Sequence, residues 1–158
     1  MEKIDLDKSE YAQKTMKLFK EGYNCSQSVV LAFSDKFEMD KETLLKLSSS
    51  FGGGMGRLRE VCGGVSGMFM VAGLLYGYDT PKDLESKTNH YKRIQELAER
   101  FTGITGSIVC RDLLGLNVKK ESPVPEERTA QYYEKRPCVE MVGTAAAVLE
   151  EYIKNNNI

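Results

Sequence analysis

Residues 48–77, SSSFGGGMGRLREVCGGVSGMFMVAGLLYG, join a glycine loop to an apolar segment. The loop has glycines at 52, 53, 54 and 56. Glycine adopts positive φ readily and lets the backbone approach other groups closely. The apolar segment begins at Cys62 and carries glycines at 63, 64, 67 and 73. Because glycine is unfavourable in an exposed helix, this pattern predicts a central helix over residues 62–76 that packs closely on its neighbours.

Helical spacing of apolar residues recurs through the rest of the chain, whereas strand alternation is scarce. We expect further helices over residues 6–20, 25–36, 41–50, 83–102, 108–114, 126–135 and 138–154. Asn24, followed three residues later by Gln27, predicts a capping box at the second of these. The sequence therefore predicts an all-α fold, a single-domain helical bundle over residues 1–158, organised around the central glycine-rich helix.

The length and charge of the chain indicate how many domains it has and which partners are not expected. The chain has 158 residues, enough for one domain with its own core. Its 22 Lys and Arg nearly balance 23 Asp and Glu, which gives no indication of a nucleic-acid or membrane partner. The start of the chain lacks the apolar region of a secretory signal, and the apolar segment after Cys62 is too short to span a bilayer. We expect a cytoplasmic protein, in which cysteines are more often catalytic or metal-binding than paired in structural disulfides.

The four cysteines, Cys25, Cys62, Cys110 and Cys138, each fall in the first turn of a predicted helix. The partial positive charge at a helix N-terminus lowers the pKa of a thiol. Because two arginines, at 57 and 59, precede Cys62, the sequence predicts that Cys62 is the most acidic of the four. We also expect at least three of the cysteines to meet in one site at the end of the central helix.

The order of these motifs resembles the C_GCAxxG_C_C family of redox-active proteins. The resemblance is carried by Cys25 in NCSQ, by the CGGVSG segment over residues 62–67, by Cys110 and by Cys138, and it runs from about Glu21 to Leu149. Gly64 stands where the family motif has alanine. The resemblance implies thiol redox chemistry or a cysteine-bound cofactor, and it names no substrate.

Two function classes follow, beside a third in which the cysteines are inert, buried small hydrophobes. In the first, the protein is a thiol redox protein and Cys62 is the attacking thiolate. The mixed disulfide is then resolved by another of the catalytic candidates: Cys25, Cys110 or Cys138. The redox partner is a small molecule or a protein. In the second, the four thiolates bind a metal ion or an iron–sulfur cluster. The wide spacing excludes a C-x-x-C redox motif and an ordinary zinc ribbon.

Other residues have secondary roles in this interpretation. The candidates for holding a cofactor or substrate are the loop residues Gly53, Gly54, Gly56, Arg57 and Arg59, although the loop lacks the G-K-[ST] ending of a phosphate-binding loop. His90 and the Tyr132–Tyr133 pair are expected at the surface. On base rates a symmetric homodimer is the expected assembly.

Overall fold

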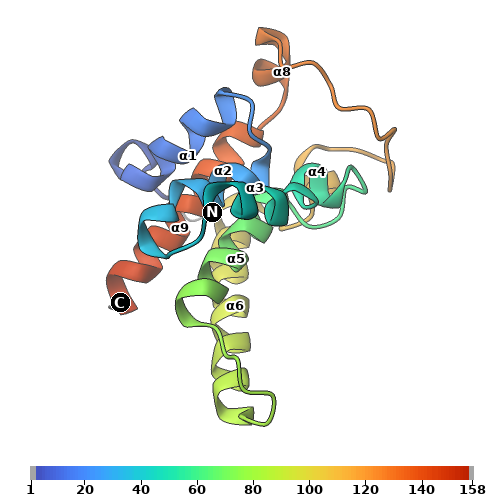
Figure 1. Ribbon diagram of the computed structural model, residues 1–158. Coiled ribbons are helices and arrows are strands. Elements are labelled where there is room, and N and C mark those ends of the chain that lie inside the picture. Colours follow the sequence, from blue (N-terminus) through green and yellow to red (C-terminus); the bar gives the residue numbers. More distant parts are fainter. Residues whose placement is uncertain (1–2, 157–158) are drawn as a thin grey trace.

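Helices follow the apolar periodicity along nearly the whole chain in the computed structural model, which describes residues 3–156 (Figure 1). The α-helices are α1 Glu10–Lys20, α2 Cys25–Ala32, α3 Lys41–Ser49, α4 Gly52–Met55, α5 Gly63–Tyr76, α6 Leu84–Thr105, α7 Cys110–Leu113, α8 Ala130–Lys135 and α9 Cys138–Asn156. Two 3-10 turns, Leu6–Lys8 and Ser34–Lys36, accompany them. Within the described residues, extended backbone pairs at a single antiparallel bridge between Val61 and Val109. The predicted all-α fold is confirmed.

Side-chain caps explain where several helices begin. The predicted capping box is present, with the Asn24 side chain accepting from the Gln27 N–H and the Gln27 side chain accepting from the Asn24 N–H. Ser9 caps α1, so the helix predicted over residues 6–20 is divided at this residue. Helix α6 continues beyond its predicted end at residue 102 to Thr105, and Gly106, whose φ of 98° is left-handed, caps it.

Helices α5 and α9 occupy the centre of the bundle. Helix α5 packs against α2, α6 and α9, while α9 also contacts α1. A Cβ placed on Gly67 would lie 2.9 Å from both the Ser26 carbonyl oxygen and the Val29 Cβ, and one on Gly64 would lie 3.3 Å from the Val142 Cα. These glycines bring α5 against the backbones of α2 and α9, which confirms the prediction of a closely packed central helix. The core includes large side chains that are almost completely buried: Phe19, Phe33, Met68, Leu97, Phe101 and Leu149.

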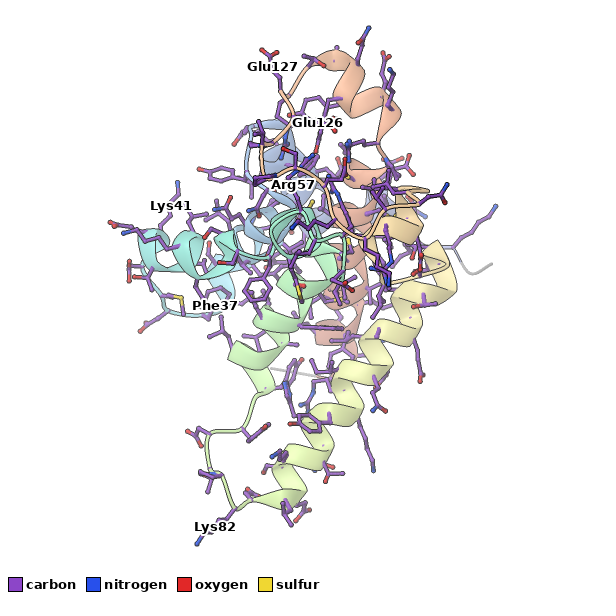
Figure 2. All side chains as sticks on the ribbon, turned by 90° about the vertical axis from the view of Figure 1, so that its right-hand side faces the viewer. Phe37, Lys41, Arg57, Lys82, Glu126 and Glu127 are labelled. Atoms are coloured by element: carbon purple, nitrogen blue, oxygen red, sulfur yellow. The ribbon has the colours of Figure 1, made fainter. Side chains whose placement is uncertain are left out.

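A turn lies at one end of the bundle and a short helix at the other. The turn between α5 and α6 projects at one end, while α8 lies at the other (Figure 1). Figure 2 shows Lys82 at the tip of that projecting turn and Glu126 and Glu127 toward the opposite end, with Arg57 below them. No described helix has the length and hydropathy needed to cross a membrane.

His90 is not at the surface as predicted. It is only 9% exposed, the ring of Tyr78 packs against it, and Arg93 Nη1 lies 3.0 Å from its Nδ1. Burial and the neighbouring guanidinium lower the pKa of His90. The charged composition of α6 concealed this burial, because Tyr78, which packs against His90, lies in the turn before the helix.

Candidate active site

All four cysteines lie at helix starts, as the sequence predicted. Cys25, Cys110 and Cys138 are the first residues of α2, α7 and α9, and Cys62 is the residue before α5. All four are free thiols, and all four line one cavity of about 200 Å³. The prediction that at least three cysteines share a site is therefore confirmed.

Glycine contacts bring the cysteine-bearing elements together. A Cβ on Gly63 would lie 2.8 Å from the Cβ of Cys25, and one on Gly54 would lie 2.6 Å from the Cβ of Cys110. Real Cβ atoms are not found at such separations, because the atoms would overlap. The glycines at these two positions thus allow the starts of α2 and α7 to approach the central loop and helix.

The glycine loop has an unusual left-handed backbone. Every residue from Gly53 to Arg57 has positive φ, and so does Arg59, with values between 57° and 70°. This conformation costs a non-glycine residue roughly 1–2 kcal/mol, so Met55 and the two arginines need compensating contacts. The prediction of a shaped loop is confirmed, although α4 formally covers part of it.

The segment after α7 supplies contacts that hold this loop. The Arg57 Nε donates to the Ser122 carbonyl at 2.6 Å, and the Glu121 N–H donates to the Arg57 carbonyl at 3.1 Å. The Glu121 carboxylate accepts from Arg59 Nε at 2.7 Å and lies 3.6 Å from Arg57 Nη2. Residues 121 and 122 thus bind both left-handed arginines through backbone and side-chain contacts.

Cys25 and Cys138 both line the cavity, and each thiol shifts the pKa of the other. At Cys25 the effect of the Cys138 thiol as a donor is the largest, and the Gly53 N–H acts in the same direction. These donors, together with the charge of Arg128, outweigh burial and lower the pKa of Cys25 to about 7. The interaction with Cys25 and burial raise the pKa of Cys138, since both favour its protonated form. The pair therefore gives up one proton near neutral pH and retains the other.

The prediction that Cys62 is the most acidic thiol is wrong. Burial and the nearby Cys25 thiolate raise the pKa of Cys62 to about 12. The guanidiniums expected to act on Cys62 are directed elsewhere: Arg59 contacts Glu121 and, at 3.6 Å, the Cys110 sulfur. Arg57 contacts Glu121 and the Ser122 carbonyl. Sequence proximity did not indicate these directions, since they depend on the left-handed backbone of the loop.

Cys110 has an arginine partner and is nevertheless not acidic. Burial raises the pKa of this thiol, and the contact with Arg59 opposes the shift without reversing it. The Cys110 N–H donates to the Glu60 carbonyl at 2.6 Å, and the Cys62 N–H donates to the Ile108 carbonyl at 2.8 Å. These bonds flank the Val61–Val109 bridge and place Cys62 and Cys110 on paired segments.

The loop candidates for cofactor or substrate binding are divided between the cavity and its surroundings. Gly53, Gly54, Arg57 and Arg59 line the cavity, whereas Gly56 ends the short helix α4 and is not part of the wall. No sequence signal selected several residues that also line it: Asn24, Leu113, Pro125, Glu126, Arg128 and Met141. Tyr132 is another: it is half-buried against the cavity rather than fully at the surface, and burial raises its pKa to about 12.

The side chains do not form a metal-binding group as they are placed. Across residues 3–156, no set of three or more His, Cys, Asp or Glu side chains is positioned to hold a metal ion. The four-thiolate ligand set for a metal ion or iron–sulfur cluster remains a prediction of the sequence alone.

Comparison with known families agrees with the cysteine pattern. No curated protein and no solved structure matches the chain. A family model described as "Putative redox-active protein (C_GCAxxG_C_C)" matches residues 23–152, which include all four cysteines and the glycine loop. The chain therefore belongs to the C_GCAxxG_C_C family.

Proposed function

We propose that the protein carries out thiol–disulfide chemistry, with Cys25 as the attacking thiolate and Cys138 as the resolving thiol. The observation that carries this proposal is that Cys25 and Cys138 line the same cavity at the starts of α2 and α9, where the Cys138 thiol helps to lower the pKa of Cys25 to about 7. The thiolate is the nucleophilic form of cysteine, and a pKa near the ambient pH combines a large thiolate fraction with good nucleophilicity.

In the first step, the Cys25 thiolate attacks one sulfur of a small-molecule or protein disulfide. A new bond forms between Cys25 and that sulfur, the substrate S–S bond breaks, and the second substrate sulfur leaves as a thiolate that takes a proton from water. Before the reaction, the Cys138 thiol and the Gly53 N–H, acting as donors, stabilise the negative charge on Cys25.

In the second step, Cys138 loses its proton and attacks the Cys25 sulfur. The Cys25–Cys138 disulfide forms, and the remaining substrate thiolate leaves. The Cys25 sulfur no longer carries a negative charge in the mixed disulfide, so the main cause of the raised pKa of Cys138 is absent at this stage. Two electrons have passed from the protein to the substrate disulfide, and a dithiol reductant would return the protein to its starting state.

Trapping the mixed disulfide tests these assignments. The reduced Cys138→Ser variant, treated with bis(2-hydroxyethyl) disulfide, is expected to accumulate a stable adduct on Cys25, located by peptide mass. The serine hydroxyl can still donate to Cys25 but cannot resolve the adduct. Wild-type protein should instead form the Cys25–Cys138 disulfide.

The matched cysteine variants decide which thiol reacts first. Cys25→Ser should form neither product, while Cys62→Ser should behave as wild type because the Cys62 thiol remains protonated at neutral pH. An adduct mainly on Cys62 or Cys110 in the Cys138→Ser variant would overturn the proposal, as would undiminished reaction in Cys25→Ser.

A further inference from the structure

We infer that the substrate is a low-molecular-weight disulfide carrying a carboxylate, which Arg128 binds at the cavity wall beside Cys25. This inference rests on the proposed thiol–disulfide function and adds the chemical class of the substrate. Three features of the site support it: the fixed position of Arg128, the excess of positive charge around the cavity, and the size and apolar character of the cavity.

Arg128 is held rigidly at the cavity wall. Its Nη1 donates to the Phe19 carbonyl at 3.0 Å, and its Nη2 donates to the Tyr23 carbonyl at 3.3 Å. The guanidinium carbon lies 4.3 Å from the centre of the Phe19 ring and 5.0 Å from that of Tyr132. A guanidinium has five N–H donors, so donors remain for a ligand after these two bonds. Because its position is already fixed, little conformational entropy would be lost on binding.

The charge of Arg128 is not neutralised by a carboxylate of the described chain. Among the described residues that line the cavity, the one carboxylate is that of Glu126, which is paired with Arg136, while Glu121 outside the lining is paired with both Arg57 and Arg59. Four guanidiniums thus face these two carboxylates and the Cys25 thiolate, so one net positive charge remains. The wall therefore favours an anion over a neutral or cationic molecule of the same size.

The cavity is small and mostly apolar. Its volume of about 200 Å³ is below the roughly 300–1,000 Å³ of pockets for drug-sized ligands. Leu113, Leu114, Pro125 and Met141 contribute apolar surface to it. A guanidinium–carboxylate pair is stronger beside such surface than in water. A short aliphatic disulfide with a terminal carboxylate matches this combination, with its S–S bond toward Cys25 and its carboxylate toward Arg128.

Three disulfides of similar size but different charge test the inference. Dithiodiglycolate is anionic, bis(2-hydroxyethyl) disulfide is neutral and cystamine is cationic. The rate of thiol release is measured for each with reduced protein, and each rate is divided by that of a small free thiol with the same disulfide. This division corrects for the intrinsic reactivity of each disulfide. The corrected rate with the anionic disulfide is then divided by the corrected rate with the neutral one. Because a change in the reactivity of Cys25 affects both rates equally, it does not alter this ratio.

We expect this ratio to exceed one in wild type and to fall about tenfold in Arg128→Gln, since a hydrogen bond between two charged groups is stronger than one between neutral groups. Arg128→Lys keeps the charge and should retain part of the preference. Arg100→Gln also removes one positive charge, but on α6, where Arg100 contacts Glu151. This control should keep the wild-type ratio.

The outcomes separate the two proposals. If all three disulfides react at Cys25 but the ratio is near one, or is unchanged by Arg128→Gln, the substrate class is wrong and the thiol–disulfide function stands. If no disulfide reacts at Cys25 in the folded wild type, the function itself fails, and the inference with it. Circular dichroism of each variant confirms that the folded protein is being compared.

Discussion

Each cysteine takes its chemical character from the groups that contact its sulfur. Cys25 and Cys62 both stand at helix starts, yet the pKa of Cys25 is lowered to about 7 while that of Cys62 is raised to about 12. At Cys25 the Cys138 thiol and the Gly53 N–H act as donors, whereas burial dominates at Cys62. A helix N-terminus is therefore insufficient to activate a thiol that is shielded from solvent and lies beside another thiolate.

At this scale, the sequence could predict that the four cysteines are placed alike but could not rank them. Asn24 and Gln27 signalled the start of α2. The direction of the Arg59 side chain was not predictable, because it follows from a left-handed residue in the glycine loop and from a partner, Glu121, far along the chain.

A pair of glycine substitutions isolates the close packing of the loop on Cys110. Gly54 and Gly115 have nearly the same φ, 66° and 67°, but a Cβ on Gly54 would meet Cys110 and Arg59, whereas one on Gly115 meets nothing within 4 Å. We expect Gly115→Ala to lower the free energy of unfolding by about 1–2 kcal/mol through backbone strain alone. Gly54→Ala should lower it by roughly 3 kcal/mol or more, because packing overlap adds to the strain.

Urea unfolding of both variants under reducing conditions measures this difference. Equal losses for Gly54→Ala and Gly115→Ala would show that the contact between the loop and Cys110 is looser than described.

Among the elements, α5 gives the clearest relation between sequence and packing. Its glycines at 64 and 67 lie against α9 and α2, while Gly73 has open space around it. The sequence indicated that the glycine-rich helix must be central, because such a helix is unfavourable alone. It could not indicate which glycines make contacts, since that depends on how the neighbouring helices cross α5.

Substitutions within this one helix are expected to have opposite signs. Gly67→Ala would place a Cβ 2.9 Å from the Ser26 carbonyl oxygen, force α2 away from α5 and lower the free energy of unfolding by roughly 2–3 kcal/mol. Gly73→Ala meets nothing within 4 Å and should raise it by about 0.5–1 kcal/mol, as expected for alanine over glycine in a helix.

Chemical denaturation of the two variants tests this account of α5. A stabilising Gly67→Ala would contradict the close approach of α2, and a strongly destabilising Gly73→Ala would contradict the open space at that position.

Across the whole molecule, the site depends on segments that lie far apart in the sequence. The stretch between α7 and α8 contributes Glu121 to the arginines of the loop and Arg128 to the cavity. Its composition, with two prolines and mixed charge, predicted an irregular connection up to residue 125, whereas residues 126–129 belonged to a predicted helix that begins only at Ala130 in the structure. No local pattern indicates that such a segment folds over the cysteines, because its contacts join residues more than 60 positions apart, as for Arg59 and Glu121.

The thiol pKa values predict how the stability of the whole protein depends on pH. Cys25 ionises more readily in the folded than in the unfolded chain, so its contribution to stability grows as pH rises from about 7 toward the unfolded thiol value of about 8.5. The raised pKa values of Cys62, Cys110 and Cys138 act in the opposite direction above that value, because the unfolded chain then loses protons that the folded chain keeps.

Reduced protein should therefore be most stable between about pH 8 and 9, as measured by urea unfolding over the range. In Cys25→Ser the rise in the free energy of unfolding below about pH 8.5 should be smaller, whereas its fall at higher pH should persist. A wild-type profile that falls steadily from pH 7 would disagree with a readily ionised Cys25.

The acidity of Cys25 is tested most directly by the alkylation rate of each cysteine against pH, read by peptide mass on the reduced, folded protein. We expect Cys25 to be labelled first, with a rate that reaches half its maximum near pH 7, while Cys62 stays almost unlabelled below about pH 9. Labelling of Cys25 with a midpoint at or above about 8.5, the value of a free thiol, would contradict this expectation, and so would labelling of Cys62 before Cys25.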